Sequence, residues 1–147
     1  MTALKFVFFG AAIMIVIGVV GFFVLGLSSQ NGSAPGLQDG RLAACPSSPN
    51  CVSSEGGTSK DKNVEPLPAD SWSKLPSVMA AMGGTVTTES DDYIAAEFKS
   101  SVFGFVDDIE FRKDGDAVHV RSASRVGHSD AGVNAARVKE LRGMIST

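Results

Sequence analysis

This sequence contains few histidines and cysteines, and it has no excess of positive charge. Each of these features excludes some classes of function. Among 147 residues there are two histidines and two cysteines, with 13 basic against 16 acidic side chains. A zinc site needs about four nitrogen or sulfur ligands, so all four of these residues would have to converge on one ion. We therefore expect no metal and no other cofactor. The formal net charge of −3 disfavours nucleic acid as a partner, because binding to phosphates depends on a positive surface.

The longest feature of the sequence is an uncharged run near the N-terminus. No charged side chain occurs from Phe6 to Leu27, and a helix of that length covers roughly 33 Å, enough to cross the hydrocarbon core of a bilayer. The apolar region of a secretory signal peptide is shorter, about 7 to 15 residues, and a cleavage site follows it at once. We therefore expect residues 6–27 to form a single-pass transmembrane helix. Lys5 precedes this span, which predicts an N-terminus inside and a domain outside the cytoplasm, as in a periplasm.

Composition divides the rest of the chain into a tether and a domain. Residues 28–41 are rich in Ser and Gly, and we expect a flexible tether there. Residues 42–147 hold the helix and strand patterns and form the expected extracytoplasmic domain.

Apolar spacing in this domain predicts an α+β fold, in which an N-terminal and a C-terminal helix pack on a four-stranded antiparallel sheet. The first helix, over 70–82, contains Pro76, which should kink it or restart it. Strands are expected at 85–89, 93–99, 105–111 and 117–126. The second helix is expected from about 131 to 144, with Ser129 or Asp130 as its cap.

The turn between the last two strands sets their expected pairing. Asp-Gly is a strong hairpin signal, so the turn is expected to be centred on 114–115. Counting outward from that turn, Asp107 lies opposite Ser122, and Asp108 lies opposite Arg121.

Both cysteines lie in the segment CPSSPNC at the start of the domain. We expect Cys45 and Cys51 to form a structural disulfide that closes a turn, because disulfides persist outside the cytoplasm. A zinc clip or a redox pair favours closer spacing, such as Cys-x-x-Cys. Lipid attachment at Cys45 is disfavoured, because Ala43 and Ala44 lie well beyond the apolar run that a signal peptidase would recognise.

Three segments are distinctive together, namely CPSSPNCVSS, GFVDDIEF and VRSASRVGHSDAGVNAARVKELR, in this order. They resemble the family known as domain of unknown function 1499, and the resemblance covers most of residues 42–145. It implies the boundaries of the domain and its extracytoplasmic placement. It implies no activity.

Polar residues beside the start of the last helix form the expected binding site. Arg125 has no acidic partner in the expected register, and the free N–H groups of a helix N-terminus suit a carboxylate or a phosphate. The candidate binding residues are Arg125, His128, Ser129, Asn134 and Arg137. We therefore expect a membrane-anchored binding or structural protein that recognises an envelope protein or a small anionic ligand.

A polar pocket around Asp107 supports an alternative, enzymatic interpretation. Asp107 shares a strand face with apolar residues, where a carboxylate is costly unless it is hydrogen-bonded or paired. As a general base it would act with Ser122 or Ser124, beside Arg137, but no histidine is placed to complete a nucleophilic relay. We favour a structural network in which Asp107 is hydrogen-bonded, with Asn134 or Arg137 nearby.

Overall fold

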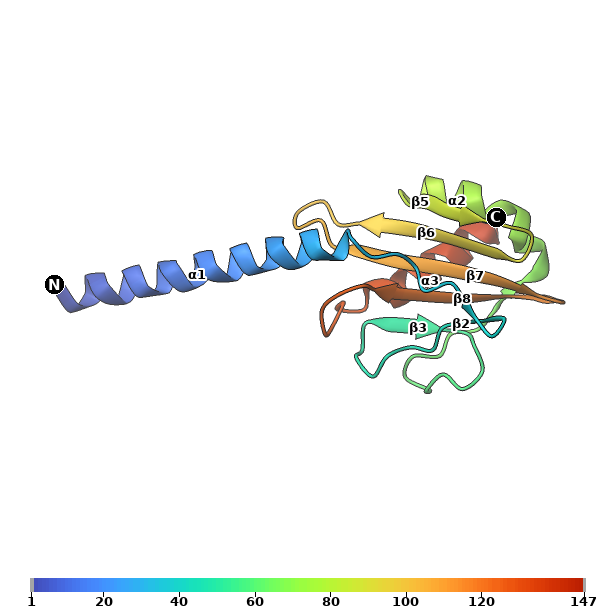
Figure 1. The fold of residues 1–147 in the computed structure, drawn as a ribbon, viewed down its shortest axis with the longest axis horizontal. Helices are drawn as coiled ribbons and strands as arrows, with labels where there is room; N and C mark the ends of the chain where they lie inside the picture. Colours follow the sequence, from blue (N-terminus) through green and yellow to red (C-terminus); the bar gives the residue numbers. More distant parts are fainter. Residues whose placement is uncertain (1, 147) are drawn as a thin grey trace.

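The structure, a computed structural model, describes residues 2–146. Helix α1 (Thr2–Ser29) projects from one end of an α+β domain, as Figure 1 shows. Residues Lys5–Ser29 are long and apolar enough to cross a membrane, a property that a signal sequence near an N-terminus shares. Most of the apolar side chains of α1 are exposed, which is typical of a helix surrounded by lipid.

A mainly antiparallel sheet forms the centre of the domain. Its main path has the order β3-β8-β7-β6-β5, and β4 also pairs with β8. The strands are β3 (Cys51–Ser53), β4 (Leu67–Pro68), β5 (Thr85–Glu89), β6 (Tyr93–Lys99), β7 (Val106–Asp114) and β8 (Ala117–Ser124). All four expected strands are present.

The expectation of a four-stranded sheet is wrong, because the sheet has six strands. The two additional strands, β3 and β4, pair with opposite ends of β8 along its outer edge. They are three and two residues long, too short for a periodic pattern to show in the sequence. The disulfide between Cys45 and Cys51, with Cα atoms 5.7 Å apart, closes the turn that leads into β3.

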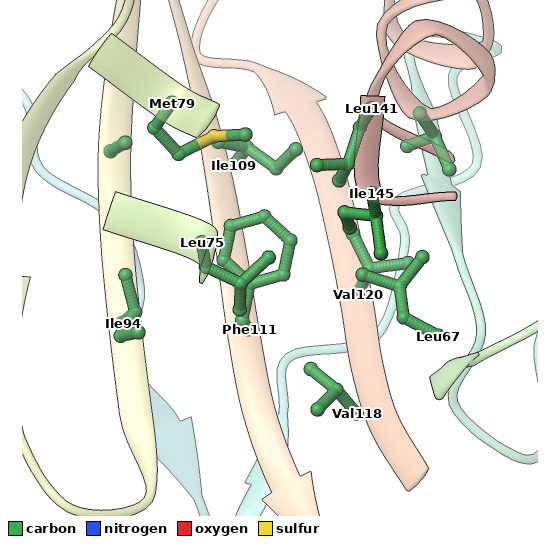
Figure 2. Packing of buried hydrophobic residues seen from close by; sticks show 12 residues of the cluster. Leu67, Leu75, Met79, Ile94, Ile109, Phe111, Val118, Val120, Leu141 and Ile145 are labelled. Atoms are coloured by element: carbon green, nitrogen blue, oxygen red, sulfur yellow. The ribbon is translucent and has the colours of Figure 1, made fainter. Parts of the chain in front are cut away.

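Three helical segments pack on one face of the sheet. They are the 3₁₀ helix η1 (Ala69–Lys74), α2 (Leu75–Ala81) and α3 (Val133–Ile145). Pro76 lies in the first turn of α2, so the helix restarts there as expected, because proline lacks only an N–H that has no intrahelical partner at that position. Figure 2 shows the core between these helices and the sheet, where Leu75, Met79 and Leu141 face Ile109 and Phe111.

The other face of the sheet is partly covered by residues 30–42, which include most of the segment 28–41 that the sequence predicts to be a flexible tether. Figure 1 shows this segment crossing in front of the strands after it leaves α1. It contains the short hairpin of β1 (Leu37–Gln38) and β2 (Arg41–Leu42). Leu42 packs against Tyr93 of β6, and the Gly36 N–H donates a hydrogen bond of 3.0 Å to Glu110 Oε1.

The turn of the last hairpin lies one residue further along than the sequence predicts. Asp114 pairs with Ala117, so Gly115 and Asp116 are the central residues. Gly115 has a φ of +54°, and a hairpin turn with glycine at its first central position requires such a positive φ. The expectation of a turn centred on 114–115 is therefore wrong.

This correction changes every cross-strand pair of the hairpin. Asp107 lies opposite Ser124 rather than Ser122, and Arg121 lies opposite Glu110. The pairing moves by two residues, and strand side chains alternate with a period of two, so Asp107 keeps the helix-covered face expected for it.

Candidate functional site

A cavity of about 720 Å³ lies at the end of the domain from which α1 projects. Its walls come from the last turns of α1, from the loop 100–105 between β6 and β7, and from the loop 125–132 before α3. Figure 1 shows both loops at this end of the domain. The volume falls within the range of about 300 to 1,000 Å³ that is typical of sites for small molecules.

Apolar and polar groups occupy different parts of this cavity. The apolar walls include Phe22 and Leu25 of α1, Phe105 before β7, and Val126 and Val133 near the start of α3. The inner wall includes an ion pair between Asp107 and Arg137, whose side chains are only 15% and 9% exposed. The site is thus a mainly apolar pocket with one ion pair on its inner wall, and Lys99 and Asp130 also belong to its lining.

Arg137 connects the cavity to a buried network of hydrogen bonds. Its Nη2 donates to Asp107 Oδ2 over 2.7 Å, and its Nη1 donates to Asn134 Oδ1 over 2.6 Å and to Ser122 Oγ over 3.1 Å. The guanidinium also lies 4.5 Å from the centroid of the Phe98 ring, within the range of a cation–π contact. This geometry agrees with the structural interpretation of Asp107, whose charge is neutralised by Arg137.

Ser122 lacks the geometry of a nucleophile. Its hydroxyl donates to Asn134 Oδ1 over 2.6 Å, and this amide oxygen is not a base that would take the proton of a serine. Ser124 is also part of this hydrogen-bond network, because its Oγ accepts a hydrogen bond from Asn134 Nδ2 over 3.1 Å.

The expectation that Ser129 or Asp130 is the cap residue of the last helix is wrong, because the N-cap of α3 is Gly132. Asp130, two residues earlier, still binds N–H groups at this helix end. The carboxylate accepts hydrogen bonds from the N–H groups of Gly132 and Asn134, over 3.0 and 2.9 Å, and α3 begins at Val133 rather than at 131. Burial opposes ionisation of this carboxyl, but the hydrogen bonds from Asn134 and Gly132 hold the pKa of Asp130 below its usual range. Asp130 therefore uses donors that an anion at this helix end would need.

Arg125 is buried between two acidic side chains, so the expectation that it lacks an acidic partner is wrong. It forms ion pairs with Asp108, over 2.7 Å, and with Glu97, and its Nη1 donates to Ser29 O over 3.1 Å. The hydrogen bond with Asp108 raises the pKa of Arg125 above its usual range, although burial opposes this. The expected pair of Asp108 with Arg121 is wrong as well, since Arg121 binds Glu110 over 2.8 Å.

The predicted site residues therefore lie in three different places. Those lining the cavity are Asp107, Ser124, His128, Ser129 and Arg137. Ser122 and Asn134 are fully buried next to Arg137, and Arg125 points to the opposite face of the sheet with Asp108. Within residues 2–146, no three His, Cys, Asp or Glu side chains gather closely enough to hold a metal ion.

Sequence reasoning missed the contribution of α1 to this site. Ser29 is buried, and its Oγ accepts a hydrogen bond of 3.0 Å from the Val106 N–H. Gly26 packs so closely on Phe103 that an added Cβ would lie 1.8 Å from the Phe103 carbonyl oxygen. The one local signal was a glycine near the end of the apolar run, where a close approach of another backbone needs the absence of a side chain.

A buried carboxylate outside the cavity gives the domain an expected sensitivity to acid. Glu55 accepts hydrogen bonds from Arg112 Nε over 2.8 Å, from Arg41 Nε over 3.0 Å and from the Leu42 N–H over 3.1 Å. Burial alone would raise its pKa, but the bonds from Arg112, Leu42 and Arg41 lower the pKa of Glu55 to about 2, from an ordinary value of 4.5. The stabilisation is therefore complete above about pH 4.5 and is lost as the pH falls through about 2.

We expect Glu55→Gln to lower the free energy of unfolding by about 2 kcal/mol at neutral pH and to flatten its decline between pH 4.5 and 2. Urea unfolding of the full chain in a non-ionic detergent, followed by the fluorescence of Trp72, the single tryptophan, measures this. Glu65→Gln, at an exposed glutamate, is the matched control and should behave as wild type. Equal acid sensitivity of Glu55→Gln and wild type would contradict this assignment.

Comparison with known proteins identifies one family. The family model described as protein of unknown function, DUF1499, matches residues 41–145. No curated protein and no solved structure matches the chain. The matched region contains the disulfide, the whole six-stranded sheet and the network around Arg137. The chain therefore belongs to the DUF1499 family of proteins of unknown function.

Proposed function

We propose that this protein is a single-pass, membrane-anchored extracytoplasmic domain that binds a lipid in the cavity beside α1. The observation that carries this proposal is that Phe22 and Leu25, both in the apolar run, form part of the cavity wall together with Phe105 and Val126 of the domain. A pocket walled partly by a membrane helix is accessible to a molecule that already lies in the membrane. Its apolar lining suits an acyl chain.

Retention of α1 is the first part of this proposal. Ser29 and Gly26 are both buried against the domain, and Arg125 donates to the Ser29 carbonyl. Removal of α1 as a signal sequence would take away these contacts and the cavity wall that Phe22 and Leu25 form. The disulfide of Cys45 and Cys51 supports a domain outside the cytoplasm, where such bonds persist, and we place the N-terminus inside.

The polar end of the ligand is the second part. Arg125 is already neutralised by Asp108 and Glu97, so we place an anionic head group at the cavity rim instead. Lys99 and His128 are exposed there, and the Lys99 Nζ is held by Gln30 Oε1 over 2.7 Å. The Lys99 side chain at the rim can bind a phosphate or a carboxylate, while the inner pair of Asp107 and Arg137 adds no net charge. The Asp130 carboxylate in the lining is occupied by the N–H groups of Gly132 and Asn134.

A photoreactive lipid tests this proposal. The full chain is placed in nanodiscs containing phosphatidylglycerol with a diazirine near the middle of one acyl chain, and cross-linked peptides are mapped by mass spectrometry. We expect cross-links in the loop 125–132, and we expect Val126→Phe, which fills the cavity, to lower their yield about tenfold. Val86→Phe is the matched control, because Val86 is a half-buried valine on β5, outside the cavity lining, and its yield should equal that of wild type.

Two results would contradict lipid binding in the cavity. Cross-links confined to α1 would show only the lipid that surrounds any membrane helix. Equal yields in Val126→Phe and wild type would show that the labelled lipid lies outside the cavity, and a protein partner at the loop 125–132 would then be the better proposal.

A further inference from the structure

We infer that the loop 100–105 enters the outer leaflet beside α1 and forms a second membrane contact of the domain. This inference rests on the proposed role of α1 as a membrane span. It adds an interaction surface, whose partner is the lipid bilayer. The loop has the sequence Ser-Ser-Val-Phe-Gly-Phe and connects β6 to β7.

The depth of the loop follows from its contacts with α1. The ring of Phe103 has its centroid 5.3 Å from that of Phe22 and 5.1 Å from that of Phe23. Phe22 precedes Leu27, the last residue of the apolar run, by a distance of roughly 7 Å along the helix axis. A bilayer that covers residues 6–27 therefore also surrounds the ring of Phe103.

The tip of the loop presents an apolar side chain that the domain does not cover. Val102 is 67% exposed, and it is adjacent in sequence to Phe103. Exposure of a valine beside an aromatic cluster is unfavourable in water and favourable at the surface of a membrane. Lys99, at the base of the loop, is exposed, and its Nζ donates to Oε1 of Gln30, three residues beyond the apolar run, over 2.7 Å. A lysine there can keep its ammonium group among the lipid head groups.

Part of the loop backbone, at Ser100, Gly104 and Phe105, is hydrogen-bonded within the protein. The Ser100 N–H donates to Phe105 O over 2.8 Å, the Gly104 N–H donates to Ser100 O over 3.1 Å, and the Phe105 N–H donates to Ser100 Oγ over 2.9 Å. The Gly104 carbonyl accepts from Gln30 Nε2 over 3.1 Å. Backbone groups that are paired in this way lower the cost of moving the loop out of water.

Two membrane contacts orient the domain where one would leave it free to rotate. The loop and α1 enter the bilayer side by side, and both contribute to the cavity wall. The cavity is thereby held at the surface of the leaflet. A pocket that exchanges lipid with the membrane must lie at this surface.

Tryptophan scanning with brominated lipids tests the inference. Full-length Val102→Trp, Ile15→Trp and Asp116→Trp are reconstituted separately in vesicles of phosphatidylcholine with or without bromine on the acyl chains, and fluorescence is compared. Ile15 lies in the middle of the proposed span, and Asp116 lies in the exposed β7–β8 turn at the far end of the domain (Figure 1). Trp72 is retained as a background common to all variants, and its ring is near Lys113 of the same distal hairpin.

We expect bromine to reduce the added fluorescence of Val102→Trp several-fold, with an emission maximum shifted to the blue, and to leave Asp116→Trp unchanged. Quenching of Ile15→Trp without quenching of Val102→Trp would overturn the loop contact and leave the proposed span intact. Absence of quenching in Ile15→Trp would overturn the proposed span itself, and with it this inference.

Discussion

Replacing Arg125 with methionine is expected to lower the free energy of unfolding by about 3 to 5 kcal/mol. The Arg125 side chain is only 7% exposed, and its guanidinium lies between the carboxylates of Asp108 and Glu97. Methionine replaces only the aliphatic part of the side chain, and it leaves two negative charges close together, one of them buried. The variant also loses the hydrogen bond to Ser29 O, so the attachment of α1 to the domain weakens.

Urea unfolding of the full chain, followed by Trp72 fluorescence, measures this loss. Arg41→Met is the matched control, because the Arg41 side chain is 57% exposed and its ion pair with Glu55 is worth at most about 1 kcal/mol. Adding Asp108→Asn to Arg125→Met should recover part of the lost free energy of unfolding, because it removes one of the two unpaired negative charges. A loss below about 1 kcal/mol for Arg125→Met would mean that the arginine is not structural, and the anion site expected from the sequence would regain its support.

The second large effect is expected at Asn134, where leucine should lower the free energy of unfolding by about 3 kcal/mol. Asn134 is fully buried and connects three segments of the domain. Its Nδ2 donates to Asn50 O before β3 and to Ser124 Oγ at the end of β8, and its Oδ1 accepts from Ser122 and Arg137. Leucine has a similar volume but leaves these buried polar groups without their partner.

Thermal and urea unfolding of Asn134→Leu separate a structural network from an enzymatic pocket. Asn63→Leu, at an exposed asparagine, should remain within about 0.5 kcal/mol of wild type. If the polar residues near Asp107 served catalysis rather than the fold, replacement of Asn134 would leave stability unchanged or raise it, as at active sites that sacrifice stability for function. Such a result would make the enzymatic alternative the better hypothesis.

Part of the candidate site was predictable from the sequence, because it depends on a pattern within one strand. The network of Asp107 with Arg137 and Asn134 was predictable, because strand alternation places Asp107 on the helix-covered face and a shift of two residues in pairing does not change that face. The partner of Arg125 was not predictable. The pairing of Arg125 with Asp108 depends on the observed register of the last hairpin. Its pairing with Glu97 depends on the position of β6, which the turn of that hairpin does not specify.

The sequence by itself determined the apolar run, the helices, the four longer strands and the family, because each depends on composition, hydrophobic periodicity or motifs within a short stretch of chain. Only the tertiary structure decided that β3 and β4 extend the sheet, and that the last turns of α1 wall a cavity. These features arise from contacts between residues far apart in sequence, such as Ser29 with Val106 and Asn134 with Asn50. Such contacts form only when the whole domain packs, so they cannot be predicted from a pattern within a short stretch of sequence.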